Sequence, residues 1–102
     1  MAIQIGNERF ETMADAVNAV ELNATRNIEI TTDPWMCPDY HAGPMYDTVV
    51  TVTCLCFGRQ VQIRYLYTDA QLAGRIPGDE DFPWDAADTE LVVDGCGVEE
   101  VE

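Results

Sequence analysis

The segment "TVVTVTCLCFGRQVQIRYLY", residues 48–67, carries the strongest structural signal in this sequence. Two runs of β-branched and aromatic residues flank Gly58-Arg59, and Gly at the first central position is typical of a type II′ hairpin turn. If this pair forms the turn, the numbers of facing residues add up to 117, and one face of the hairpin is entirely apolar or aromatic. That face comprises Val50, Val52, Cys54, Cys56, Val61, Ile63, Tyr65 and Tyr67. Because a slip of one residue would mix the two faces, the pattern predicts a hairpin at about 48–67.

The rest of the chain predicts a small α+β domain built around this hairpin. Short alternating segments at 2–12, 27–32 and 89–95 are expected as strands, the first with a turn at Gly6-Asn7. Residues 12–24 have apolar residues at helical spacing, with Thr12 as the N-cap. Residues 33–47 contain three prolines and are expected as a loop. We therefore expect one domain over residues 1–102, with a mainly antiparallel sheet of four to five strands and one amphipathic helix on it.

The charge of the chain is strongly negative and unevenly distributed. The 102 residues include 19 acidic residues, five arginines and no lysine, for a net charge of −14. Residues 1–68 hold eight acids and four arginines, a net of −4, whereas residues 69–102 hold eleven acids and only Arg75, a net of −10. Such a field repels nucleic acids and anionic membranes and speeds encounters with basic surfaces. We therefore expect a basic protein as partner, with neither nucleic acid nor membrane bound directly; the oligomeric state is left open.

The most acidic stretch is "GDEDFPWDAADTELVVDG", residues 78–95, with seven carboxylates and no basic residue. On a strand, residues two apart share a face at about 6.6 Å, so carboxylates there can form a row of negative charge. Two aromatic side chains in the same stretch are candidate anchors, as Trp35 is in the other loop, although packing against the core is an equal alternative for each tryptophan. The predicted partner-binding residues are Asp79, Glu80, Asp81, Phe82, Trp84, Asp85, Asp88, Glu90 and Asp94, and the acids of the tail 99–102 can extend them.

In composition, this acidic last third, including "GDEDFPWDAADTE", resembles that of phage-encoded nucleic-acid mimics, which include anti-CRISPR and anti-restriction proteins. The resemblance implies a non-enzymatic inhibitor that occupies the nucleic-acid-binding groove of a defence nuclease complex in the host cytoplasm, with no cofactor and no catalytic residue. The alternative in the same physical class is an immunity protein or antitoxin that acts against a basic nuclease toxin.

Metal or thiol chemistry is a weaker interpretation of the same sequence. Cys37, His41, Cys54 and Cys56 are the candidate zinc ligands, and Cys37 with His41 is a conceivable catalytic dyad. The hairpin register favours core packing for Cys54 and Cys56, since a thiol among apolar side chains behaves as a small hydrophobe. Without a secretory signal the cysteines are expected to be free thiols in the cytoplasm.

Calcium binding and adaptation to salt are the remaining alternatives. Asp79, Asp81, Asp85 and Glu90 fall at positions 1, 3, 7 and 12 of a twelve-residue loop, but Trp84 stands where an EF-hand requires glycine. The absence of lysine, together with abundant acids, also resembles proteins of extreme halophiles. That interpretation predicts charge spread evenly over the surface, which the uneven distribution along the chain does not favour.

Overall fold

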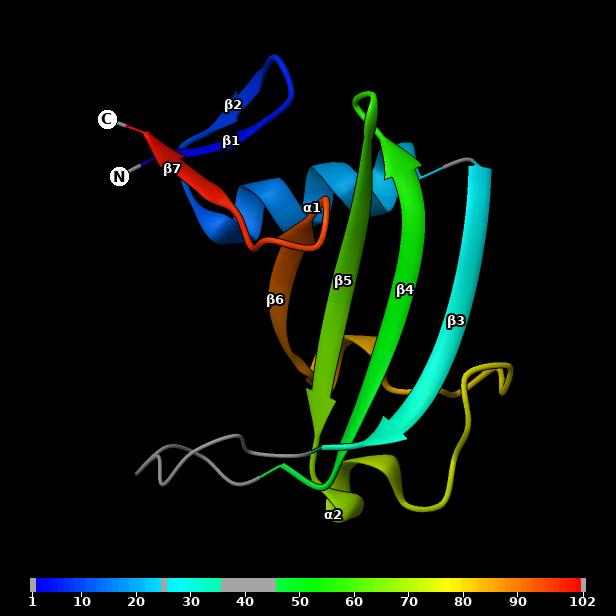
Figure 1. The fold of residues 1–102 in the computed structure, drawn as a ribbon. Helices are drawn as coiled ribbons and strands as arrows, with labels where there is room; N and C mark the ends of the chain where they lie inside the picture. The colour runs from blue at the N-terminus through cyan, green and yellow to red at the C-terminus, as the bar shows by residue number, and fades with distance from the viewer. Residues whose placement is uncertain (1, 25, 36–45, 102) are drawn as a thin grey trace.

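A computed structural model describes residues 2–24, 26–35 and 46–101. Its elements form two antiparallel sheets, a four-stranded one and a three-stranded one, together with the eleven-residue helix α1 (Figure 1). In chain order the elements are β1 (Ala2–Ile5), β2 (Glu8–Phe10), α1 (Met13–Asn23), β3 (Arg26–Pro34), β4 (Thr48–Cys56), β5 (Arg59–Tyr67), α2 (Asp69–Leu72), a 3-10 turn (Trp84–Ala86), β6 (Asp88–Val93) and β7 (Glu99–Val101). The predicted α+β class is confirmed, and the helix begins as expected after Thr12, whose hydroxyl accepts a hydrogen bond from the Asp15 amide at 3.1 Å.

The four-stranded sheet has the order β3-β4-β5-β6 and contains the predicted hairpin, but with a different register. Cys54 faces Val61 and Val52 faces Ile63, so the facing numbers add up to 115 and not to 117. The turn is Phe57-Gly58, and both residues have positive φ, 54° and 74°, as a type I′ turn requires. The predicted turn was therefore wrong, while the predicted apolar face was retained, because a shift of two residues keeps every side chain on its own side.

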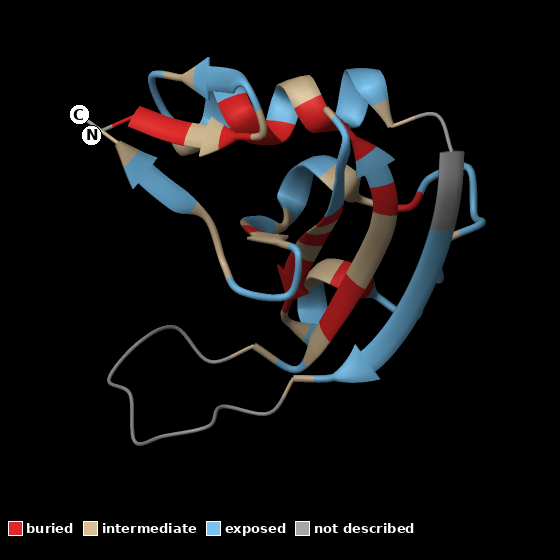
Figure 2. Ribbon diagram, turned by 45° about the horizontal axis from the view of Figure 1, so that its top comes forward, coloured by how far each residue is buried: buried red, intermediate tan, exposed pale blue. Residues whose placement is uncertain are grey.

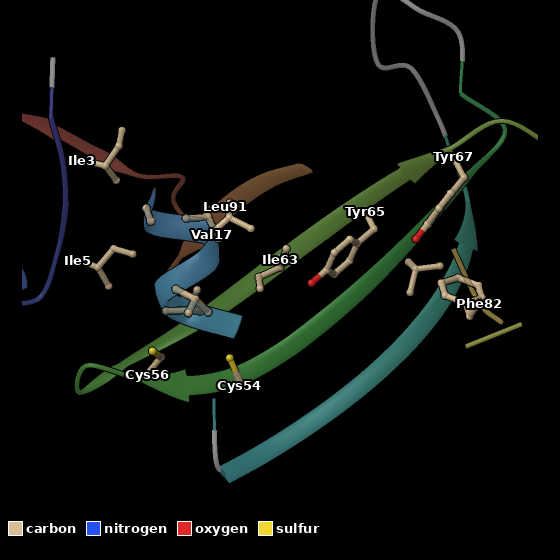
Figure 3. Packing of buried hydrophobic residues seen from close by; sticks show 14 of the residues in the cluster. Ile3, Ile5, Val17, Cys54, Cys56, Ile63, Tyr65, Tyr67, Phe82 and Leu91 are labelled. Atoms are coloured by element: carbon tan, nitrogen blue, oxygen red, sulfur yellow. The ribbon is translucent and has the colours of Figure 1, made fainter. Parts of the chain in front are cut away.

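One side of this sheet, called here the inner face, carries the core. Residues 30, 32 and 34 of β3, the even-numbered residues of β4 and the odd-numbered residues of β5 and β6 point to it. Figure 3 shows Ile63 and Tyr65 of β5 and Leu91 of β6 on the side where Val17 of α1 lies, and all four residues are buried. Burial of such side chains contributes about 1.5–3 kcal/mol each, so this layer between sheet and helix is the main source of stability.

The three-stranded sheet, of order β2-β1-β7, was not foreseen as a separate sheet. It joins the two ends of the chain, since Ala2 faces Val101 across β1 and β7. Its β1–β2 turn touches the hairpin turn: a Cβ added to Gly6 would lie 2.6 Å from the carbonyl oxygen of Phe57. Phe57 in turn packs on Phe10 of β2, with ring centroids 5.8 Å apart. The two turns thus fix the small sheet against the tip of the long hairpin.

Within the described part of the chain, no helix combines the length and apolar character that a membrane crossing needs.

Candidate partner-binding face

The acidic segment does not form one continuous row. In Figure 1 the loop at 76–82 swings out on the β3 side of the large sheet, whereas β6 is the strand at the opposite edge. These edges are three strand spacings apart, about 14 Å. The loop with the first three acids of the segment therefore lies on the other side of the sheet from β6, which carries Asp88 and Glu90, so the charge of the segment is not gathered at one edge.

Three carboxylates of the segment are paired with arginines from elsewhere in the chain, which the local sequence could not reveal. The pairs are Arg75–Asp81 at 3.7 Å, Arg64–Glu90 at 2.5 Å and Arg59–Asp94 at 3.3 Å. Ion pairs at such partly exposed sites contribute only about 0–1 kcal/mol to stability. Their main effect here is to reduce the negative field at Asp81, Glu90 and Asp94.

The remaining carboxylates of the segment are exposed. The carboxylate of Asp79 accepts a hydrogen bond from the Ile76 amide at 2.9 Å, and that of Asp88 accepts one from the Tyr46 hydroxyl. Glu80 and Asp85 form no ion pair with the residues that the structure describes. None of these four side chains is ion-paired with an arginine in the described part of the chain.

The two aromatic residues of the segment pack on the inner face. Phe82 is 6% exposed and its ring centroid lies 5.4 Å from that of Tyr67. Trp84 is half-buried, with ring centroids 4.6 Å from Phe82 and 5.0 Å from Tyr65. The prediction that Phe82 is an exposed anchor was therefore wrong: it belongs to the core, and Trp84 packs against that core, as the alternative interpretation held.

The opposite side of the sheet, called here the outer face, gathers carboxylates along both of its edges. The register places Glu29 and Asp33 there on β3, and Asp88 and Glu90 there on β6. Between these edges the two central strands present mostly polar side chains, namely those of Thr51, Thr53, Gln62 and Arg64. The outer face thus has an acidic border on each side of a mainly uncharged strip.

An aromatic pair lies at one end of the outer face. Trp35 and Tyr46 meet edge to face with ring centroids 5.8 Å apart, and the Arg64 guanidinium lies 5.3 Å from the Trp35 ring. The Tyr46 hydroxyl donates to Asp88, and mainly this hydrogen bond raises the pKa of Tyr46. Trp35 also donates its backbone N–H to the Asp47 carbonyl at 3.0 Å, which holds the two chain segments that carry these rings beside each other.

Tyr46 was not singled out from the sequence. The sequence indicates Trp35 only as a further anchor in the loop expected at 33–47. In the structure β3 extends to Pro34 and β4 begins at Thr48, so the two aromatic residues stand just beyond paired strand ends. The signal that could have found them is their symmetric placement on either side of a proline-rich stretch.

In the described part of the chain, no group of three or more His, Cys, Asp or Glu side chains is arranged to hold a metal ion. Cys54 and Cys56 are 1% and 3% exposed, and burial raises the pKa of both thiols. Their predicted packing in the core is confirmed. Cys37 and His41 lie outside the described residues.

The candidate ligands for calcium do not form a common site either. Two of these four residues, Asp81 and Glu90, are ion-paired with Arg75 and Arg64. Asp81 is part of the loop on the β3 side, and Glu90 is on β6. The twelve-residue spacing in the sequence therefore does not correspond to a shared site.

Comparison with protein-family models, with curated proteins and with solved structures gives no match for this chain.

Proposed function

We propose that this protein is a non-enzymatic, acidic inhibitor that occupies a basic, nucleic-acid-binding surface of a partner protein. The partner we favour is a CRISPR or restriction complex, which a phage or mobile element would oppose in the cytoplasm of its host. The observation that carries the proposal is the outer face of the four-stranded sheet, where acidic borders on both edges accompany the Trp35–Tyr46 pair.

The two kinds of side chain on this face have complementary effects on binding. Carboxylates raise the rate at which a basic partner is encountered, but they contribute less to the lifetime of the complex. Aromatic side chains in desolvated contacts supply most of the affinity of typical protein interfaces. Trp35 and Tyr46 are half-buried and pack against each other, so they have surface left to bury and lose less side-chain entropy on binding.

The dimensions of the outer face support mimicry of nucleic acid. Its acidic borders on β3 and β6 are about 14 Å apart, three strand spacings. The major groove of B-DNA, which phosphates border on both sides, is about 12 Å wide. A protein surface that recognises phosphates across a groove can therefore meet carboxylates at a comparable separation here.

The experiment is a capture assay with variants of equal charge. Immobilised wild type, an Asp33→Lys/Asp88→Lys variant of the outer face and a Glu8→Lys/Glu11→Lys control are exposed to host lysate. Captured proteins are then eluted with salt or with duplex DNA. All four substituted residues are exposed, and both variants change the net charge by the same amount. We expect wild type and control to capture a nucleic-acid-binding protein that DNA releases, and the outer-face variant to retain at least tenfold less.

Equal losses in both variants would mean that only net charge matters, and the proposal would be wrong. Capture of a basic nuclease toxin through the same face would assign the protein to the immunity class instead.

A second candidate, adaptation to a salt-rich solvent, is favoured by one observation. The loop at 76–82, with three acids, lies on the β3 side of the sheet, whereas Asp88 is on β6 (Figure 1), so the acids of the last third are more evenly spread in space than in sequence. The dependence of folding on salt distinguishes this candidate from the first.

A further inference from the structure

The strand β3 presents a long free edge. It is the terminal strand of the four-stranded sheet and spans nine residues, against six for β6 at the other edge. From Glu29 to Asp33 its outward backbone groups form no backbone hydrogen bond with other residues that the structure describes. Figure 2 shows this part of β3 as exposed, in contrast to β4 beside it.

The bulge and the proline that can protect an edge strand occur only at the ends of β3. Natural proteins block such edges with charged side chains, especially lysines, and with prolines, bulges or very short strands; between its ends β3 has the charged residues Glu29 and Asp33 but no lysine. In β3 the pairing register shifts between Arg26 and Glu29, and Pro34 closes the other end. The five residues 29–33 between these points are regularly paired to β4 on one side, and on the other side they pair with no strand among the described residues.

An apolar cavity of about 240 Å³ adjoins this edge on the inner face. Its floor is a cross-strand row formed by Ile63, Val52 and Ile30, in which Ile63 is 1% exposed and Ile30 is 47% exposed. Ala24 at the end of α1, Tyr65 and Trp84 line it as well, together with Glu21, whose carboxylate accepts a hydrogen bond from the Tyr65 hydroxyl at 3.1 Å. At about 30 Å³ per water molecule, the cavity has room for a side chain of several heavy atoms. Because exposure increases along the row toward β3, the cavity opens at the free edge.

The outer side of the same edge is acidic. Glu29 and Asp33 are exposed and form no ion pair with residues in the described ranges. Four residues apart on a strand, they are separated by about 13 Å. A strand that extends the sheet beyond β3 would place its own outer-face side chains beside these two carboxylates.

We propose that the edge of β3 binds an extended segment of the basic partner as a fifth, antiparallel strand. This proposal rests on the proposed function for the nature of the partner. Backbone hydrogen bonds to residues 29–33 supply the affinity, and side chains on the two faces supply the specificity. On the inner face, the residue opposite Ile30 is apolar and enters the cavity. On the outer face, basic residues lie opposite Glu29 and Asp33.

Antiparallel geometry fixes the order of these residues in the partner. If the apolar residue opposite Ile30 is position 0, the residue opposite Glu29 is position +1 and the residue opposite Asp33 is position −3. The recognised segment is therefore basic-x-x-apolar-basic. The β3 strand of a second copy does not fit this pattern, because the residue after its Ile30 is Thr31, which is not basic. A second copy would also bring a net charge of −14 to an acidic edge.

The direct test uses a nine-residue, end-blocked peptide with Leu at position 0, Arg at −3 and +1, and Thr elsewhere. Binding to the ¹⁵N-labelled full chain is followed by NMR. We expect amide shifts concentrated on residues 29–33. A peptide of the same composition with both arginines moved by one position should bind at least tenfold more weakly. In an added strand, alternate backbone N–H groups point toward β3 and the others point away from it. N-methylation of the peptide amides that point toward β3 should therefore abolish binding, whereas N-methylation of the other amides should not. Equal binding of the two peptides, or indifference to N-methylation, would overturn the proposal.

Variants of the protein test the same contacts from the other side. Ile30→Thr should weaken peptide binding at least fivefold, and Ile30 is exposed enough for the fold to tolerate the change. Glu29→Arg/Asp33→Arg should lose the arginine peptide and gain one with Glu at −3 and +1. The matched control, Glu8→Arg/Glu11→Arg, has the same net charge and should bind the arginine peptide as wild type does. Loss in the control equal to that in the edge variant would reduce the effect to net charge and overturn the proposal.

The outcomes separate this inference from the proposed function. If the outer-face variant loses the captured partner while the peptide does not bind, the edge proposal is wrong and the function stands. If the peptide binds in the stated register but no nucleic-acid-binding protein is captured, the edge is confirmed as a peptide site and the proposed function is wrong.

Discussion

Gly6 and Gly58 both have positive φ, 58° and 74°, but their surroundings differ. A Cβ on Gly6 would lie 2.6 Å from the Phe57 carbonyl oxygen, whereas a Cβ on Gly58 would meet nothing within 4 Å. Gly58→Ala should therefore lower the free energy of unfolding only by the strain of alanine in the left-handed backbone conformation, about 1–2 kcal/mol. Gly6→Ala should lower the free energy of unfolding by clearly more, since the backbone of one turn must move. Urea denaturation measures both, and equal costs would mean that the two turns are not in contact.

Burial of ionisable side chains makes the fold sensitive to alkali. Burial, and secondarily Asp85, raises the pKa of Tyr67 from 10.0 to about 12, and burial raises the pKa of the Cys54 thiol above 9.0. In the unfolded chain these groups lose their protons at lower pH than in the folded protein. The free energy of unfolding should therefore be constant up to about pH 9 and fall as the pH rises toward 12.

Tyr67→Phe isolates one part of this effect. The variant loses the hydrogen bond from the Tyr67 hydroxyl to the Pro83 carbonyl, 3.0 Å long, which should cost about 1 kcal/mol at pH 7. Its stability should then decline less between pH 9 and pH 12 than that of wild type. Urea unfolding under reducing conditions at several pH values provides the comparison, and an unchanged decline would contradict the assignment to Tyr67.

At the scale of elements, the loop at 76–87 is held to the inner face by aromatic packing. Phe82→Ala should lower the free energy of unfolding by about 3–5 kcal/mol, the usual cost for a buried phenylalanine. Ile76→Ala in the same loop is the control: Ile76 is 63% exposed, and we expect a change within about 0.5 kcal/mol. Thermal or urea unfolding distinguishes them. A small effect of Phe82→Ala would contradict its place in the core and return it to consideration as a surface anchor.

The elements that sequence could predict are those with a long regular pattern. β4 and β5 alternate over nine residues each, so their apolar face was evident, but the register depended on Phe57. A bulky residue at positive φ is rare, and its contact with Phe10, from a distant strand, is invisible locally. The strand signal at 2–12 and its turn at Gly6-Asn7 are confirmed by β1 and β2, but β7 has three residues, too few to show alternation, so its pairing with β1 in a separate sheet was not predicted.

The candidate site was less predictable for the same physical reason. Arg59, Arg64 and Arg75 reach the acidic segment through sheet pairing and loop closure, neither of which has a short-range signal. The outer-face borders combine Glu29 and Asp33 of one strand with Asp88 of another, 55 residues or more along the chain. Charge distribution along the sequence therefore identified an acidic protein, but not the face on which its carboxylates are arranged.

At the scale of the whole molecule, the net charge of −14 sets the response to salt. Self-repulsion among exposed carboxylates opposes the compact state and is screened by ions. If the acids serve binding, the protein should melt cooperatively above about 50 °C in dilute buffer, as ordinary domains do, and gain a few degrees on addition of 0.5 M salt. Circular dichroism over a salt series measures this. Folding only at molar salt would instead establish solvent adaptation.

The pairing of β1 with β7 has a kinetic consequence. Gln4 faces Glu99, so the three-stranded sheet closes a loop that includes nearly the whole chain. The hairpin of β4 and β5, by contrast, closes over the two residues Phe57 and Gly58, and such hairpins form within about 1–10 μs. Because long-range closure must overcome more chain entropy before contacts repay it, we expect the hairpin to form early and the small sheet to form last. Refolding should accordingly be slow for a chain of this size, and amide exchange should be fastest in β1, β2 and β7.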